Sequence, residues 1–272
     1  MIATQDYGWS QLATGSGRTW PEATDWAMRL AAGAGFAGWE PFVATPADMD
    51  RIALLAARHG LNLLSIFVSG PLHDPAKMAT TEARILDICR SAAGHGCRFV
   101  MIYPAGAPKS DDELTTQARA LDRIAGALQP LGLTLCYHPE EPEMRLAAHE
   151  FHHMMLGTDP ALVRLCLDPD TNWRGAGGSM LAVLDVVRLY GARTVALHIR
   201  QSQGGIWAET VGEGDLAYPL IVQALRKAGA RPLLVVEHAY DPATPRTLDP
   251  VTAHRRSCDY VRTVLLPILE PL

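Results

Sequence analysis

Short apolar runs alternate with amphipathic stretches along the whole chain, and this alternation constrains the fold more than any other sequence feature. The runs are rich in β-branched residues and nearly continuous in their apolar character, which is typical of strands buried on both faces of a parallel sheet. We expect eight such strands, at Ile2–Trp9, Gly35–Phe42, Leu61–Val68, Arg98–Tyr103, Leu133–His138, Val163–Asp168, Thr194–Arg200 and Pro232–His238.

Helix signals fill the intervals between these runs. We expect helices at Trp20–Ala34, Thr45–His59 and Ser110–Leu128, and the last two open with an N-cap hydroxyl followed by acidic residues. Glycines that would close helices stand just before several strands, at Gly60, Gly96, Gly132, Gly191 and Gly229. The strand–helix unit therefore recurs roughly every 30 to 35 residues.

Eight strand–helix units in 272 residues predict an α/β fold, namely a (β/α)8 TIM barrel. An open, doubly wound sheet is the alternative, and it would need a glycine-rich phosphate turn after an early strand. The sequence contains neither GxGxxG nor GxxxxGK[ST], which favours the barrel. Because no linker or low-complexity tract interrupts the pattern, we expect a single domain over residues 1–272.

The composition is that of an ordinary globular protein, with 48% hydrophobic residues and a formal net charge of −5. This charge argues against nucleic acid as a partner, because nucleic-acid binders present basic surfaces to the phosphates. No apolar run approaches the ~20 residues that a membrane helix needs, and the N-terminus lacks the pattern of a secretory signal. Five cysteines without a CxxC pair indicate reduced thiols, so we expect a cytoplasmic protein.

Polar side chains follow the apolar runs at several strand ends, as Glu40, His138, Asp168, His198 and Glu237 do. Any one of them alone is better explained as a core residue with a hydrogen-bonded partner, since an unpaired buried charge is costly. Residues that end four successive strands of a barrel, however, converge on its axis. Carboxylates and imidazole without thiolates predict a divalent cation, with Mn²⁺ as our first choice and Mg²⁺, Co²⁺ or Zn²⁺ as alternatives.

The order of His138, Asp168, His198 and Glu237 on strands five to eight resembles the xylose isomerase-like barrels. That superfamily includes sugar isomerases and epimerases, inosose dehydratase, hydroxypyruvate isomerase and endonuclease IV. The resemblance covers essentially the whole chain, and its sharpest parts are Cys166–Asp168, Leu197–Ser202 and Val235–Glu237.

The resemblance implies four metal ligands, of which Asp168, His198 and Glu237 match the family pattern directly. Three residues compete for the ligand from strand five. His138 stands where the epimerases have a glutamate, while Glu143 stands where related barrels supply one a few residues later. We expect Glu143 to be the fourth ligand with His138 beside it, and His138 and Glu140 remain alternatives.

The resemblance also implies proton transfer next to a carbonyl, through an enediolate that the metal stabilises. The epimerases use paired glutamates; Glu237 matches one of them and His138 replaces the other, so we expect both to be catalytic. Carboxylates, planar hydrogen-bonding groups and loop tryptophans near the strand ends are candidates for substrate binding, namely Glu40, Glu140, Asp170, Trp173, Arg200, Gln201 and Trp207.

We therefore expect a divalent-metal-dependent isomerase or epimerase that acts on a keto-sugar or related polyol. The histidine on strand five leaves two alternatives open: a lyase or dehydratase on a keto-inositol or 3-keto-glycoside, and a catalytically inactive sugar-binding barrel. Endonuclease IV-like repair is disfavoured because it needs more histidines for its zinc ions. The apolar stretch Val264–Leu272 leaves a homo-oligomer open, since it could pad the barrel or seat a partner.

Overall fold

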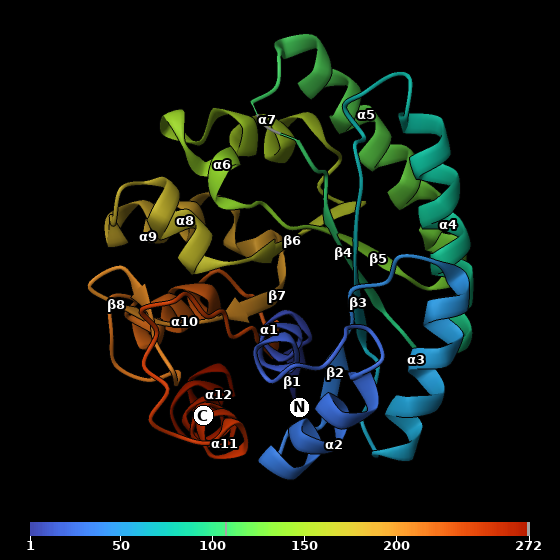
Figure 1. The fold of residues 1–272 in the computed structure, drawn as a ribbon. Coiled ribbons are helices and arrows are strands. Elements are labelled where there is room, and N and C mark those ends of the chain that lie inside the picture. Colours follow the sequence, from blue (N-terminus) through green and yellow to red (C-terminus); the bar gives the residue numbers. More distant parts are fainter. Residues whose placement is uncertain (107, 271–272) are drawn as a thin grey trace.

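The computed structural model describes residues 1–106 and 108–270. Within these residues, eight parallel strands form one sheet in the order β2-β1-β10-β7-β6-β5-β4-β3, and bridges from Gly38 to Asn62 and from Phe42 to Phe67 join its two edges into a nearly closed barrel (Figure 1). The strands are β1 Ile2–Gln5, β2 Gly38–Glu40, β3 Ser65–Ser69, β4 Phe99–Tyr103, β5 Thr134–Tyr137, β6 Val163–Leu167, β7 Thr194–Ile199 and β10 Leu233–Val236. The expected TIM barrel is confirmed.

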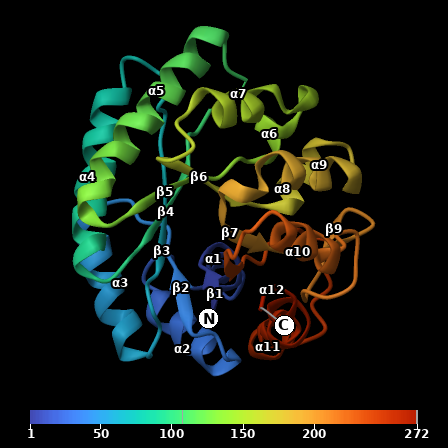
Figure 2. The same ribbon diagram turned by 180° about the vertical axis from the view of Figure 1, so that it is seen from behind.

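Helices surround the barrel in both views (Figures 1 and 2). Contacts between α11 and α2 close the ring of helices. A small hairpin of β8 Ser202–Gln203 and β9 Ile206–Trp207 follows β7. The α-helices are α1 Tyr7–Gly15, α2 Thr24–Ala34, α3 Pro46–Arg58, α4 Met78–Gly94, α5 Asp111–Leu128, α6 Glu141–Met144, α7 His149–Gly157, α8 Pro169–Gly175, α9 Met180–Tyr190, α10 Tyr218–Lys227, α11 Pro250–Tyr260 and α12 Leu266–Leu269.

The helix boundaries follow the expected capping chemistry at most positions. Thr45 and Ser110 cap α3 and α5, each within a reciprocal capping box with the acid three residues on. The predicted closing glycines adopt left-handed φ values at Gly60, Gly96, Gly132 and Gly229. Gly191 differs: its φ of −55° is right-handed, because it opens a 3-10 turn (Gly191–Arg193) that continues α9.

Two predicted elements begin or end elsewhere. The strand expected over Ile2–Trp9 ends at Gln5, and α1 takes over from Tyr7. Trp9 and Ala13 are fully buried four residues apart, which is the spacing of one helix face, and Trp9 stacks on His254 with ring centroids 3.8 Å apart. The helix expected from Trp20 begins only at Thr24.

The alternation of side chains along the strands builds the barrel interior in layers. Phe67, Met101, Cys136, Cys166 and Ala196 form one buried cluster inside the barrel. Residues two positions further along a strand point to the same side. His138, Asp168 and His198 therefore lie one layer above this cluster, toward the carboxyl ends of the strands.

All five cysteines are buried free thiols. Across the described ranges, no helix has the length and apolar character needed to cross a bilayer. In the stretch Val264–Leu272, Leu265 and Leu269 are buried against the barrel's outer helices, whereas residues 271–272 lie outside the described residues.

Candidate active site

Four donor side chains meet at the carboxyl ends of β5, β6, β7 and β10. Ligand atoms of His138, Asp168, His198 and Glu237 all lie within 4.8 Å of one another, and the four residues are buried. Nδ1 of His198 is 3.1 Å from Nε2 of His138 and 2.7 Å from Oε2 of Glu237. Nε2 of His138 is 3.9 Å from Oδ2 of Asp168. Two imidazole nitrogens and two carboxylate oxygens thus face one point.

The nitrogens on the far sides of both imidazoles face glutamates. Nε2 of His198 lies 2.8 Å from Oε1 of Glu40, a fully buried residue at the end of β2. Nδ1 of His138 is buried without a hydrogen bond, 3.6 Å from Oε1 of Glu140. The structure therefore places Glu40 and Glu140 behind the two rings, where a carboxylate can fix the orientation of an imidazole.

Arg200 brings a buried positive charge to this cluster of acids. Its guanidinium pairs with Asp168, lies 3.3 Å from Asp170 through Nε, and lies 3.7 Å from Glu237 through Nη1. Burial alone would raise the pKa of Glu237, but the charges of Arg200 and His198 outweigh burial and lower that pKa to about 2. Glu237 is therefore a carboxylate at neutral pH.

Burial and the neighbouring His198 lower the pKa of His138 to about 3. The imidazole of His138 is thus neutral at neutral pH and keeps a lone pair on one nitrogen. A neutral imidazole is the form that binds a metal ion.

Glu143 lies outside this group. Oε2 of Glu143 accepts a hydrogen bond from the Glu140 backbone, and Oε1 lies 3.4 Å from Nζ of Lys109. The same Lys109 ammonium lies 3.0 Å from Glu150, and all three side chains are buried. Burial raises the pKa of Glu143 to about 7. The carboxylate of Glu143, which we expected to complete the ligand set, is therefore paired with Lys109 instead.

A cavity of about 600 Å³ opens above the donor group. Its walls come from the ends of several strands and include polar and aromatic side chains, among them Gln5, Asp6, Tyr7, Trp20, Phe42, Glu140, Asp170, Arg174, Arg200, Trp207 and Glu237. This volume falls within the usual range for small-molecule sites. Polar edges beside aromatic faces suit a ligand with many hydroxyls and an apolar ring face.

Several expected substrate-binding residues line this cavity together. Nε1 of Trp207 donates to Oδ2 of Asp170 at 3.0 Å, and the guanidinium of Arg174 lies 4.8 Å from the centre of the Trp207 ring. Glu140 is partly exposed here, and burial raises its pKa to about 8. The structure thus brings Glu140, Asp170, Arg200 and Trp207 to one wall.

Two other expected residues lie elsewhere. Gln201 donates to the carbonyls of Gly212 and Leu216 and accepts from the Ser202 and Leu216 backbone, so its amide holds the loop after β9 in place. Trp173 lines a separate, open groove with neighbouring glycines.

Sequence reasoning missed Asp6, which also lines the cavity. Its carboxylate accepts from the Phe42 backbone at 3.0 Å, and burial followed by the nearby charge of Glu40 raises its pKa to about 8. The strand-end rule that singled out the other acids would also have found Asp6 if β1 had been ended at Gln5.

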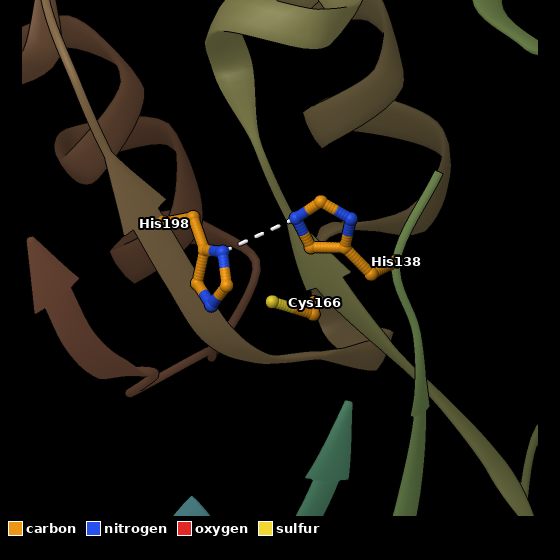
Figure 3. A group of neighbouring side chains, drawn as sticks. All are labelled: His138, Cys166 and His198. Carbon is orange, nitrogen blue, oxygen red and sulfur yellow. Dashed lines mark hydrogen bonds between the residues drawn. The ribbon is translucent and has the colours of Figure 1, made fainter. Parts of the chain in front are cut away.

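Cys166 forms the floor of the donor group. Its thiol comes within 4.8 Å of donor nitrogens of both His138 and His198, and Figure 3 shows the sulfur beside the two rings, which turn toward each other. Burial raises the pKa of Cys166 to about 12, so it remains a thiol.

The donor set fits a divalent cation. Four nitrogen and oxygen donors that converge from four strands supply neutral imidazoles and carboxylates, which are common ligands of divalent metals in enzymes. The outer nitrogen of His198 faces a glutamate that has no hydrogen bond of its own, and this arrangement is common behind metal-binding histidines.

Comparisons with known proteins agree with this architecture. The family model described as xylose isomerase-like TIM barrel matches residues 28–264. No curated protein sequence matches the chain.

Solved structures share the fold at low identity. A sugar phosphate isomerase/epimerase from Parabacteroides distasonis ATCC 8503 superposes with a TM-score of 0.78 at 15% identity, over 99% of this chain and 95% of that one. A 3-keto-D-glucoside 4-epimerase from E. coli superposes with a TM-score of 0.71 at 17% identity, over 96% of this chain and 98% of that one. A xylose isomerase-like TIM barrel protein from Mycobacterium smegmatis in complex with magnesium superposes with a TM-score of 0.72 at 14% identity, over 92% of this chain and 90% of that one.

Proposed function

Because the chain belongs to the xylose isomerase-like TIM barrel family, we propose that it is a divalent-metal-dependent enzyme that isomerises or epimerises a keto-sugar or related polyol. The observation that carries this proposal is the convergence of His138, Asp168, His198 and Glu237 under a cavity of about 600 Å³. Sugar epimerases and isomerases among the structural neighbours support the substrate class.

The metal would be held by His138, Asp168, His198 and Glu237, with His138 in the place that we first expected Glu143 to fill. A bound divalent cation would supply the positive charge that stabilises an enediolate. The neighbour in complex with magnesium supports a divalent cation of some kind.

Proton transfer needs a base that faces the substrate. Oε1 of Glu237 is the oxygen that His198 does not engage, and the low pKa of this residue keeps it deprotonated at neutral pH. Glu140 lines the same cavity, and its pKa of about 8 allows it to hold a proton and release it near neutral pH. We assign these two residues to the transfer, while Arg200, Asp170 and Trp207 orient the hydroxyls of the substrate.

A lyase or dehydratase is the second candidate, and one observation favours it. The epimerases that this family contains use a matched pair of glutamates, whereas here strand five supplies His138, and Glu140 lies on the loop that follows. Two unlike bases suit the removal of one proton with loss of a β-substituent, as from a keto-inositol or a 3-keto-glycoside.

Exchange with heavy water tests the proposal. The Mn²⁺-loaded protein would be incubated in D2O with a panel of ketopentoses, ketohexoses, keto-inositols and 3-keto-glucosides, and the products analysed by mass spectrometry and NMR. Deuterium at one carbon of an isomer supports the isomerase or epimerase, and deuterium with loss of a substituent supports the lyase. Sugar binding without exchange by any compound would overturn both, and Asp168→Ala serves as the inactive control.

A further inference from the structure

The ligand set contains two imidazoles where a carboxylate-rich centre would have one. Nε2 of His138 and Nδ1 of His198 lie 3.1 Å apart and face the same point as Asp168 and Glu237. We propose that this second imidazole makes the centre selective for a borderline transition metal such as Zn²⁺, Co²⁺ or Fe²⁺ over Mg²⁺. The inference rests on the metal centre of the proposed function and names the class of ion that the centre takes.

Neither carboxylate that follows β5 competes with His138 for a place in the donor group. Glu143 is turned back to the Glu140 backbone and to Lys109, so its carboxylate is already satisfied. Glu140 stands on the other side of the His138 ring, next to Nδ1 rather than Nε2. The nitrogen of His138 is therefore the donor from this strand that points into the group.

A glutamate lies behind each ring. The outer nitrogen of His198 is 2.8 Å from Glu40, and the outer nitrogen of His138 is 3.6 Å from Glu140. A carboxylate behind an imidazole fixes the ring and strengthens its donor nitrogen. His138 has no hydrogen bond to Glu140, but its Nε2 lies in the donor group beside Nδ1 of His198, which favours both histidines as ligands.

The chemistry of these donors decides between ions. Mg²⁺ demands oxygen ligands in near-ideal octahedral geometry and gives up its waters reluctantly. Imidazole nitrogens suit zinc, iron and the other later transition metals. The floor of the site is the Cys166 thiol, a soft group with no attraction for Mg²⁺ (Figure 3).

Calorimetric titration of the metal-stripped protein with MgCl2, MnCl2, CoCl2 and ZnCl2 tests the inference without any substrate. We expect Co²⁺ and Zn²⁺ to bind on the order of 100-fold or more tightly than Mg²⁺. His138→Glu, which restores an oxygen donor, should reduce this ratio by about tenfold or more. The control is Glu143→Gln, the other carboxylate candidate near strand five, which should keep the wild-type ratio.

The outcomes separate the two claims. An unchanged ratio in His138→Glu, or wild-type Mg²⁺ affinity equal to that for Co²⁺, would overturn the selectivity while leaving the metal centre in place. Failure of every ion to bind would overturn the metal centre itself. If His138→Glu does not fold, the NMR spectrum of the Co²⁺-loaded wild type decides: two shifted exchangeable imidazole protons support the inference, and one contradicts it.

Discussion

Nε2 of His198 lies 2.8 Å from Oε1 of Glu40, on the opposite side of the ring from the Nδ1 atom that faces Glu237. Neither oxygen of Glu40 has a hydrogen-bond partner of good geometry, and the residue is fully buried. A charge buried in this way is costly unless a partner offsets it. The pairing accounts for a glutamate at the end of β2 and directs Nδ1 of His198 toward the centre.

Glu40→Gln should weaken metal binding by about 10- to 100-fold, the usual effect of losing a carboxylate behind a metal-binding histidine. Competition with a coloured chelator measures the affinity, and Glu270→Gln, on the exposed C-terminal segment, is the matched control. Unaltered affinity in Glu40→Gln would show that Glu40 has no part in orienting His198.

Glu143→Gln should leave the metal content unchanged but reduce stability. The variant removes one of the two carboxylates around the buried Lys109 ammonium, and Glu150 at 3.0 Å remains. Weakening one charged hydrogen bond of this kind costs about 2 kcal/mol in the free energy of unfolding. Urea denaturation and metal analysis of the same sample check both statements. Loss of metal with unchanged stability would return Glu143 to the ligand set.

Sequence patterns located Asp168, His198 and Glu237 because each ends a strand, and strand ends converge in a barrel. They favoured Glu143 over His138 as the fourth donor, whereas the donor group contains His138. The difference depends on how the chain turns after β5. The carboxylate of Glu143 turns back into a capping box and meets Lys109, which is 34 residues away in sequence. Such a contact is a matter of tertiary packing and leaves no local signal.

Gln201 illustrates the same limit outside the cavity. Its position after His198 indicated a substrate contact, whereas its amide makes three backbone hydrogen bonds to Gly212 and Leu216 and accepts a fourth from the backbone of Ser202. Gln201→Ala should therefore destabilise the protein by about 2 to 3 kcal/mol, because buried backbone groups lose their partners. Chemical denaturation measures this loss, and wild-type stability in the variant would contradict the structural role.

Acid should destabilise the protein through His238. Burial lowers the pKa of this residue from its ordinary value of 6.5 to about 4. Since the unfolded chain then binds the proton more tightly, the contribution of His238 is complete above about pH 6.5 and is lost as the pH falls toward 4. At pH 5 the loss relative to pH 7 amounts to about 2 kcal/mol.

Comparison with His238→Phe isolates this effect from other titrating groups. Ser257, the partner of Nε2 of His238 at 2.9 Å, still donates to Ala253 and accepts from Val211 in the variant. Urea midpoints at pH 7 and pH 5 should therefore differ less for His238→Phe than for the wild type. Equal differences in the two proteins would exclude His238 as the source.

The fold itself was more predictable than the site. Buried parallel strands are recognisable in the sequence as apolar runs. Thr45 and Ser110 indicate helix starts because their capping hydrogen bonds are local and need no tertiary contact. The boundary between β1 and α1 was not predicted from the sequence, because Trp9 suits a strand as well as a helix. Only its packing on His254 decides between the two.

The metal content of the purified protein tests the central claim most directly. Elemental analysis of the wild type after incubation with Co²⁺ and desalting should show about one equivalent of metal, as expected of a single centre. Asp168→Ala/Glu237→Ala removes both carboxylate ligands and should retain almost none, provided that circular dichroism shows a folded barrel. Equal metal content in the folded variant and the wild type would contradict the assignment of His138, Asp168, His198 and Glu237 as the centre.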